Sequence, residues 1–283
     1  MKEIASTPLV SIVIAVLDGA KTIEHCIESV GRQTYPNIEL VIMDGGSTDG
    51  TIEILRQNAN TIRYWDSAKD KGVYHAWNKA LEHISGEWVI FLGADDFLWS
   101  DDAIEQLVSR LVRTQKSNRI VYCQVAMVDA AGAILAVAGL PWGRIKKKFR
   151  QVMGIPHPAT VYHKTVFCVH GKFDESFRIA GDFEFLLREL ISADALFIPN
   201  LILTGMHHGG ISSNPVNSLL MLREMRIAQK KHGQRIAGLH WMISLVRARL
   251  RLFLWDFVGK EKAAKVLDWG RFLLGKRPFW TRI

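Results

Sequence analysis

Short apolar runs alternate with helix-like segments over the first third of the chain. Residues 10–16 form an almost continuous run rich in β-branched side chains, which is typical of a buried strand. Three further runs predict strands in the same way: residues 38–43, 62–65 and 88–92. Apolar residues at helical spacing predict the intervening helices: residues 20–33, a segment that begins near Thr51, and residues 73–84.

This alternation predicts an α/β fold in which a mostly parallel sheet carries helices on both faces. Ligands bind such sheets outside the carboxyl ends of the strands. Asp44 ends the second predicted strand, and Asp95 and Asp96 follow the fourth. We therefore expect these three acids to converge at one edge of the sheet, although they are distant in the sequence.

The pattern changes in the second half of the chain. Shorter strands are expected over 119–140, and a helix over 181–190. The pair Asn214-Pro215 marks a predicted boundary, and the residues after it are helical in pattern, basic, and rich in leucine and aromatic side chains. The sequence thus predicts one domain over residues 1–215 and a basic amphipathic helical extension over 216–283.

Composition suits a globular protein: of 283 residues, 48% are hydrophobic and 23% are charged. The three scattered cysteines form no CxxC pair, which argues against a disulfide framework or a zinc site and fits a reducing cytoplasm. Residues 1–8 contain an acid and a proline, so no signal peptide is expected. No apolar stretch is long enough to predict a membrane-spanning helix.

Positive charge is the main compositional bias, because the net charge is +8 and basic residues gather with aromatic ones in 216–283. Basic amphipathic helices with aromatic side chains are typical of elements that lie in the interface of an anionic membrane. A helical appendage that packs on the domain, or forms a dimer, is the alternative interpretation. Nucleic-acid binding fits the charge, but no binding motif supports it, so we expect no nucleic acid as partner.

Asp44 precedes the glycine-rich turn 45–50. A carboxylate at a strand end can accept hydrogen bonds from a base N–H or a ribose hydroxyl, and glycines let a ligand approach the backbone closely. A strand-to-helix turn with a helix cap explains the same residues equally well. Asp44 is therefore a candidate nucleotide contact.

Asp95 and Asp96 adjoin at the end of a buried apolar strand. Two like charges in one place are costly unless something neutralises them. A hard divalent cation such as Mg²⁺ or Mn²⁺ does so, and it takes oxygen ligands together with substrate phosphates. The pair therefore predicts a metal site that would offset the charge on a departing diphosphate. A solvated acidic turn is the alternative.

Asp182 lies at the start of the predicted helix 181–190. A carboxylate there can act as a general base that deprotonates an acceptor hydroxyl. From its position alone, the simpler interpretation is favoured, because acids near a helix start are stabilised by the helix dipole.

The three acidic blocks, in this order and spacing, resemble inverting family 2 glycosyltransferases of the GT-A fold, above all bacterial enzymes of exopolysaccharide or O-antigen synthesis. The resemblance covers about residues 8–213. It is carried by VSIVIAV (10–16), SVGRQTYPNIE (29–39), MDGGSTDGT (43–51), DKGVYHAWNKA (70–80), GEWVIFLGADD (86–96) and GKFDE (171–175). It implies a Rossmann-like sheet with a nucleotide-sugar half over about 1–100 and an acceptor half over about 101–215.

The resemblance also implies roles for single residues. The implied nucleotide-sugar-binding positions are Ala15 and Leu17 at the base pocket, Asp44 at the base, Lys71, Asn78 and Lys79 along the diphosphate, and Asp95 at the ribose or donor sugar. Asp96 would ligate the metal ion, Mg²⁺ or Mn²⁺. Asp182 would be the catalytic base in a single displacement that inverts the anomeric centre.

Two departures from the family pattern stand out, because Gly45 and Gly93 occupy positions where many members carry an acid. Base recognition then rests on Asp44 alone, and Asp95 and Asp96 are the whole acidic signature. Three histidines are candidate acceptor or phosphate contacts: His157, His207 and His208. Structural histidines with satisfied hydrogen bonds are the simpler interpretation for each.

The sequence therefore predicts transfer of a sugar from a nucleotide donor, UDP-sugar before GDP-sugar, to a lipid-linked or oligosaccharide acceptor in cell-surface polysaccharide synthesis. The expected location is the cytoplasm, at the inner face of the cytoplasmic membrane. One alternative is transfer directly to polyprenyl phosphate. Another is a catalytically silent, membrane-associated scaffold, against which the intact acids Asp44, Asp95, Asp96 and Asp182 argue.

Overall fold

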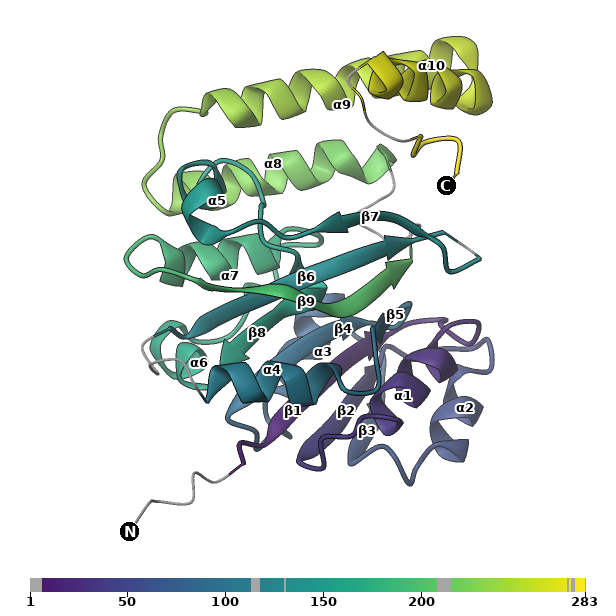
Figure 1. The fold of residues 1–283 in the computed structure, drawn as a ribbon, viewed down its shortest axis with the longest axis vertical. Helices are drawn as coiled ribbons and strands as arrows, with labels where there is room; N and C mark the ends of the chain where they lie inside the picture. The colour runs from purple at the N-terminus through teal and green to yellow at the C-terminus, as the bar shows by residue number, and fades with distance from the viewer. Residues whose placement is uncertain are drawn as a thin grey trace.

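The computed structural model describes residues 7–112, 118–129, 131–207, 215–273, 275 and 278–282. A β-sheet forms its centre, and the C-terminal helices form an additional layer (Figure 1). The strands of the described residues are β1 Val10–Val16, β2 Ile38–Asp44, β3 Tyr64–Ser67, β4 Trp88–Gly93, β5 Asp96–Leu98, β6 Ile120–Val128, β7 Ile134–Ala138, β8 Thr160–His163 and β9 Leu196–His207. The helices are α1 Ile23–Gly31, α2 Thr51–Gln57, α3 Val73–Ala80, α4 Ala103–Leu111, α5 Trp142–Phe149, the 3-10 turn η1 His157–Ala159, α6 Thr165–His170, α7 Gly181–Leu190, α8 Pro215–Lys231, α9 Leu239–Val258 and α10 Lys260–Leu273.

The strand order is β3-β2-β1-β4-β8-β6-β9-β5, with β7 paired to β6. The four predicted strands are present, although the third lies at Tyr64–Ser67, two residues later than predicted. They pair in parallel: β1 with β2 and β4, and β2 with β3. β8 runs antiparallel to both β4 and β6, and β5 runs antiparallel to β9, so the sheet as a whole is mixed. The pair β6–β7 is also antiparallel. A short connection that begins at Asp129 joins these two strands, and only antiparallel strands can be joined so closely.

Helices cover both faces of the sheet, as predicted. Successive strand residues point to opposite faces. Ile12 and Ile14 of β1 join a core cluster with residues of α1, α2 and α4. Val13 joins a second cluster with residues of α3, α5, α7 and α8. The near-continuous apolar character of β1 therefore results from burial on both sides.

The predicted helical extension is confirmed, and its described residues form the helices α8, α9 and α10. Leu222 and Met225 of α8 belong to the core cluster that contains α7, so α8 packs directly on the domain. Trp241 of α9 donates from Nε1 to the carbonyl of Leu222 at 2.8 Å, which joins α9 to α8. The division at residue 215 stays a prediction. Among the described residues, the helices are all too short or too polar to cross a membrane.

Candidate active site

The carboxyl ends of the parallel strands lie in register at one edge of the sheet. Asp44 of β2 is opposite Val16 of β1 and Ser67 of β3. Gly93 of β4 is opposite Ala15 of β1. The convergence expected for Asp44 and the Asp95-Asp96 segment is therefore present, since both segments leave the sheet at this edge.

Asp44 is buried and organises the loop that follows it. Its Oδ2 accepts hydrogen bonds from the Gly46 N–H at 3.0 Å, the Ser47 N–H at 2.9 Å and the Ser67 hydroxyl at 2.6 Å. Its Oδ1 accepts the Ser47 hydroxyl. Gly46 has a φ of 89°, in the left-handed region that favours glycine. Most of the accepting capacity of Asp44 is thus used within the protein, and its contact with a nucleotide base stays a prediction.

The loops after β1 and β2 are joined to each other by hydrogen bonds. Asp18 N–H donates to the Ser47 hydroxyl at 2.7 Å, and the Asp18 carboxylate accepts from Thr48 N–H at 2.9 Å. Leu17 at this rim is 62% exposed, and its Cδ1 lies 3.4 Å from where a Cβ on Gly45 would stand. An apolar side chain is therefore presented to solvent beside the glycine turn, and its contact with a nucleotide base stays a prediction.

Asp96 carries a buried carboxylate that is only half satisfied. Its Oδ2 accepts the Gly93 N–H at 3.0 Å, whereas its Oδ1 is enclosed and no described residue forms a hydrogen bond with it. Burial, and second to it the charge of Asp95, raise the pKa of Asp96 well above its ordinary value. A Cβ on Gly93 would lie 2.8 Å from Asp95 Oδ1 and 2.9 Å from Asp96 Oδ2, so the two carboxylates converge on one point. This arrangement fits a divalent cation with oxygen ligands.

His207 lies beside this acidic pair at the end of β9. Its Nδ1 donates a hydrogen bond to the backbone carbonyl of Asp95 at 2.9 Å. Phe97 of β5 is paired with Gly205 of β9, and its ring occupies the space that a Cβ on Gly205 would need. This close packing of β5 on β9 brings His207 next to Asp95. His208 lies outside the described residues.

The described residues contain no group of three or more histidine, cysteine or acidic side chains arranged to hold a metal ion. A cation at Asp95 and Asp96 would therefore take its remaining ligands from the phosphates of a bound donor and from water, as Mg²⁺ commonly does.

Asp182 is the second residue of α7, and one of its two carboxylate oxygens is held in place. Oδ1 accepts the Phe183 N–H at 2.8 Å and the Tyr74 hydroxyl at 3.3 Å, whereas no described residue donates to Oδ2. A Cβ on Gly181 would lie 2.8 Å from the Tyr74 ring, so only glycine admits this approach. Burial, followed by the charge of Asp182, raises the pKa of Tyr74 well above its ordinary value, so the hydroxyl stays a donor. Tyr74 is in the first turn of α3, which begins beyond the carboxyl end of β3.

His157 belongs to an aromatic cluster within electrostatic reach of Asp182. Its ring lies 4.8 Å from that of Trp77 and 6.0 Å from that of Tyr162. His157 Nε2, Trp77 Nε1 and Tyr162 Oη are enclosed, and none of them has a hydrogen-bond partner within the described ranges of the chain. Burial lowers the pKa of His157, although the charge of Asp182 opposes the shift, so the ring is neutral. A contact of His157 with the acceptor stays a prediction.

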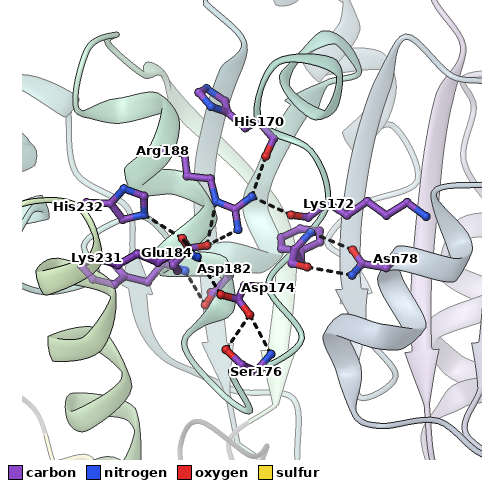
Figure 2. A network of polar contacts seen from close by, with 12 residues as sticks. Asn78, His170, Lys172, Asp174, Ser176, Asp182, Glu184, Arg188, Lys231 and His232 are labelled. Carbon is purple, nitrogen blue, oxygen red and sulfur yellow. Dashed lines mark hydrogen bonds and ion pairs between the residues drawn. The ribbon is translucent and has the colours of Figure 1, made fainter.

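The three residues expected along the diphosphate differ in their availability. Lys71 is exposed. Asn78 is buried, and its amide donates to the Phe173 carbonyl and accepts from the Phe173 N–H, each at 2.9 Å, so that it joins α3 to the chain leading to α7 (Figure 2). Lys79 pairs with Asp66 at 2.7 Å. In this structure only Lys71 is free to reach a phosphate.

Several residues of the site have roles that the sequence did not indicate. Ser47 and Ser67 hold Asp44, Tyr74 holds Asp182, and Glu224 of α8 binds the segment before Asp182. Tyr74 stands within the segment 70–80 that carries the family resemblance, which was the available signal. Ser67 and Glu224 carry no local signal, because their partners are far away in the sequence.

Comparison with known proteins finds relatives over most of the chain. The sequence profile described as Glycosyl transferase family 2 matches residues 11–167. A PGL/p-HBAD biosynthesis glycosyltransferase of Mycobacterium tuberculosis is 29% identical over 228 residues, which cover 77% of this chain and 84% of that protein.

Two solved structures show the same fold. S. aureus TarS 1-349, in complex with UDP-GlcNAc, matches with a TM-score of 0.62 and 15% identity over 91% of this chain and 83% of that chain. The mannosyltransferase PcManGT from Pyrobaculum calidifontis, in complex with GDP-Man and Mn²⁺, matches with a TM-score of 0.62 and 19% identity over 98% of this chain and 84% of that chain.

Proposed function

This chain belongs to glycosyl transferase family 2, and from that premise we propose that it transfers a sugar from a nucleoside-diphosphate donor to a hydroxyl of a lipid-linked or oligosaccharide acceptor in cell-surface polysaccharide synthesis. It is a glycosyltransferase of the GT-A fold. The observation that carries the proposal is the convergence of Asp95 and Asp96 beside Gly93, with one enclosed carboxylate oxygen that no described residue pairs with.

The donor is proposed to lie across the carboxyl edge of the parallel strands. Leu17 and Ala15 would contact the base, Asp44 would hold the loop beside it, and Lys71 would reach the diphosphate. The two fold relatives were solved with UDP-GlcNAc and with GDP-Man, which supports a nucleotide-sugar donor and leaves both bases in contention. We favour a UDP-sugar, with a GDP-sugar as the second candidate.

Asp95 and Asp96 would hold Mg²⁺ or Mn²⁺, with Asp96 as the principal ligand. Such an ion offsets the negative charge that develops on the departing diphosphate. The buried Oδ1 of Asp96 has no partner among the described residues, so its ionised form is costly until a cation is bound. His207 would orient this segment through the carbonyl of Asp95.

Asp182 is proposed as the catalytic base. Its Oδ2 would accept the proton of the acceptor hydroxyl while that oxygen forms a bond to the anomeric carbon. The bond from the anomeric carbon to the diphosphate breaks in the same step, so that the configuration inverts. Tyr74 would hold Oδ1 and thereby direct Oδ2 to the acceptor.

The surface of α9 supports a peripheral position on a membrane. Seven apolar residues of this helix are 39–77% exposed and recur at intervals of one, three and four, which places them along one face: Leu239, Met242, Ile243, Val246, Leu250, Phe253 and Phe257. The opposite face packs on α8 through Trp241 and Ala248. Helix α9 therefore has an apolar face in addition to the one it buries.

Basic residues flank this exposed face, which we call the α9 stripe. Helical geometry places Arg247 on one side of the stripe and Arg249 on the other. Val266, Trp269, Phe272 and Leu273 of α10 add further exposed apolar side chains. Apolar surface bordered by arginine suits the interface of an anionic bilayer. We therefore propose that the enzyme acts at the inner face of the cytoplasmic membrane, where a polyprenyl-linked acceptor is within reach.

Calorimetric titration with UDP and with GDP, with and without Mn²⁺, tests the donor proposal. We expect one of the two nucleotides to bind in a Mn²⁺-dependent manner, and a panel of nucleotide sugars assayed for hydrolysis then identifies the sugar. If neither nucleotide binds in the presence of metal, the silent-scaffold alternative gains and the transferase proposal fails.

A further inference from the structure

Helix α8 holds the backbone segment that leads into Asp182. The buried carboxylate of Glu224 accepts hydrogen bonds from three consecutive backbone N–H groups. Its Oε1 accepts from Arg178 at 2.9 Å, and its Oε2 accepts from Ile179 at 2.8 Å and from Ala180 at 2.9 Å. Ala180 is the N-cap of α7, and Asp182 lies two residues further on.

These three hydrogen bonds fix the direction in which the chain enters α7. The donors are backbone groups without freedom to rotate, and the acceptor is a buried charge. If the segment shifted by one residue relative to Glu224, an N–H group or a carboxylate oxygen would be buried without a hydrogen-bond partner. Such a loss costs free energy. The orientation of the α7 start therefore depends on the position of Glu224.

A second contact from α8 holds α7 on the other side of Asp182. Glu184 is fully buried, and it accepts from Lys231 Nζ at 2.9 Å and from His232 Nε2 at 2.8 Å, at the end of α8 (Figure 2). Lys231 lies two helical turns after Glu224 on the same helix. Asp182 thus lies between two contacts with the α8 region: the segment 178–180 before it and Glu184 after it.

We propose that Glu224 is a positioning residue for Asp182 and that α8 is part of the catalytic apparatus. Tyr74 fixes one oxygen of the Asp182 side chain, and Glu224 fixes the backbone from which that side chain projects. Together they direct the free Oδ2 to the acceptor hydroxyl. This inference rests on the proposed role of Asp182 as the base.

The test is a steady-state comparison of full-length Glu224→Gln and Glu224→Asp with the unchanged chain. Glu224→Gln replaces one acceptor oxygen by an amide NH2 group, which can only donate and would face the N–H donors, and Glu224→Asp keeps the charge on a shorter side chain. Leu107→Ala is the matched control, because Leu107 is fully buried on α4, in the core cluster on the other face of the sheet. Thermal unfolding of each variant shows whether the losses of stability are comparable.

We expect both Glu224 variants to lower kcat by at least about 10-fold, because small misplacements of a catalytic group are costly. Donor KM and the calorimetric Kd for the nucleotide should stay within about twofold, since the donor contacts are elsewhere. Leu107→Ala should leave kcat within about twofold at a similar loss of stability. If Glu224→Gln does not fold, Glu224→Asp carries the test.

The inference is overturned if the kcat of the Glu224 variants falls no further than that of Leu107→Ala, or if donor affinity falls in step with kcat. Asp182→Asn separates this failure from failure of the proposed function. If Asp182→Asn keeps transfer activity, the assignment of the base is wrong. If Asp182→Asn is inactive while Glu224→Gln behaves like the control, only the positioning role is wrong.

Discussion

Gly93 donates its backbone N–H to Asp96 Oδ2 at 3.0 Å, so that the end of β4 satisfies one oxygen of a buried carboxylate, while the other, Oδ1, has no partner in the part of the chain that the structure describes. Glycine at this position leaves room for the carboxylates of Asp95 and Asp96, since a Cβ would stand within 3 Å of both. The missing acid at position 93 is therefore compatible with a metal site made by these two aspartates.

Asp96→Asn should abolish metal-dependent turnover, with a loss of about 100-fold or more, because the neutral amide no longer offsets the cation charge. Isothermal titration should show that the variant no longer binds Mn²⁺ together with the nucleotide. In the absence of metal it should be at least as stable as the unchanged chain, since it removes a costly buried charge. Asp102→Asn, an exposed acid before α4, is the control and should bind Mn²⁺ normally. Unchanged turnover in Asp96→Asn would remove this residue from the metal site.

Asp182→Asn should keep nucleotide affinity within about twofold but lower kcat by about 100-fold to 10,000-fold, the usual contribution of a general base. Tyr74→Phe should lower kcat less, by about 10-fold, because it removes one hydrogen bond to Oδ1 and keeps the base. Both effects are measured as release of diphosphonucleotide that depends on acceptor. Transfer that persists in Asp182→Asn would place the base elsewhere.

Acid stability should depend on Glu184. Burial alone would raise the pKa of Glu184, but hydrogen bonds from Arg188, Lys231 and His232 outweigh it and lower the pKa below its ordinary value. A lowered folded pKa means that the stabilisation is complete above the ordinary glutamate pKa of about 4.3 and is lost as the pH falls through the lower folded value.

Glu184→Gln should therefore cost about 3–5 kcal/mol at pH 7, the usual cost of removing one partner of a buried ion pair, and its stability should change less with pH between about 5 and 3. Urea unfolding at a series of pH values measures both effects. Glu53→Gln, which breaks an exposed pair with Arg56, should cost about 0.5 kcal/mol or less. Equal pH dependence in Glu184→Gln and the unchanged chain would show that other groups control acid unfolding.

The α9 stripe should mediate attachment to anionic vesicles. Replacing both Phe253 and Phe257 by serine should reduce co-sedimentation with such vesicles by about 10-fold or more, since each exposed ring would otherwise bury apolar area in the bilayer. Val112→Ser, at an exposed apolar residue outside the stripe, should bind like the unchanged chain. Undiminished vesicle binding would discard the membrane role, and a change from dimer to monomer in solution would assign the stripe to a second copy of the chain.

The architecture of the first hundred residues was predictable because each strand and helix has a local pattern, and because parallel strands necessarily bring their ends together. Asp44, Asp95 and Asp96 were found for that reason. The mixed parallel and antiparallel pairing of the later strands was not predictable. In the sheet β8 lies between β4 and β6, and β9 lies between β6 and β5, although both strands come later in the sequence than their neighbours.

The partners of single side chains were the least predictable feature. Asn78 and Lys79 share a segment with Lys71, yet Asn78 holds a backbone and Lys79 pairs with an acid on β3. A segment that borders a ligand contains residues that support it as well as residues that can touch it. Periodicity could not identify Glu224 either, because its significance lies in the three N–H groups across the interface between α7 and α8.

The contacts between α8 and the start of α7 have a consequence for when the enzyme becomes active during its synthesis. Domains generally fold as units, so a site is complete only when its last element has been made. Asp96 begins β5, which pairs with β9 at residues 204–206, and Glu224, Lys231 and His232 follow later still. The acids of the donor side and Asp182 therefore both wait for the second half of the chain, and Asp182 is held only when α8 has been made. Transfer competence would be acquired last, at about the stage when the apolar face of α9 leaves the ribosome.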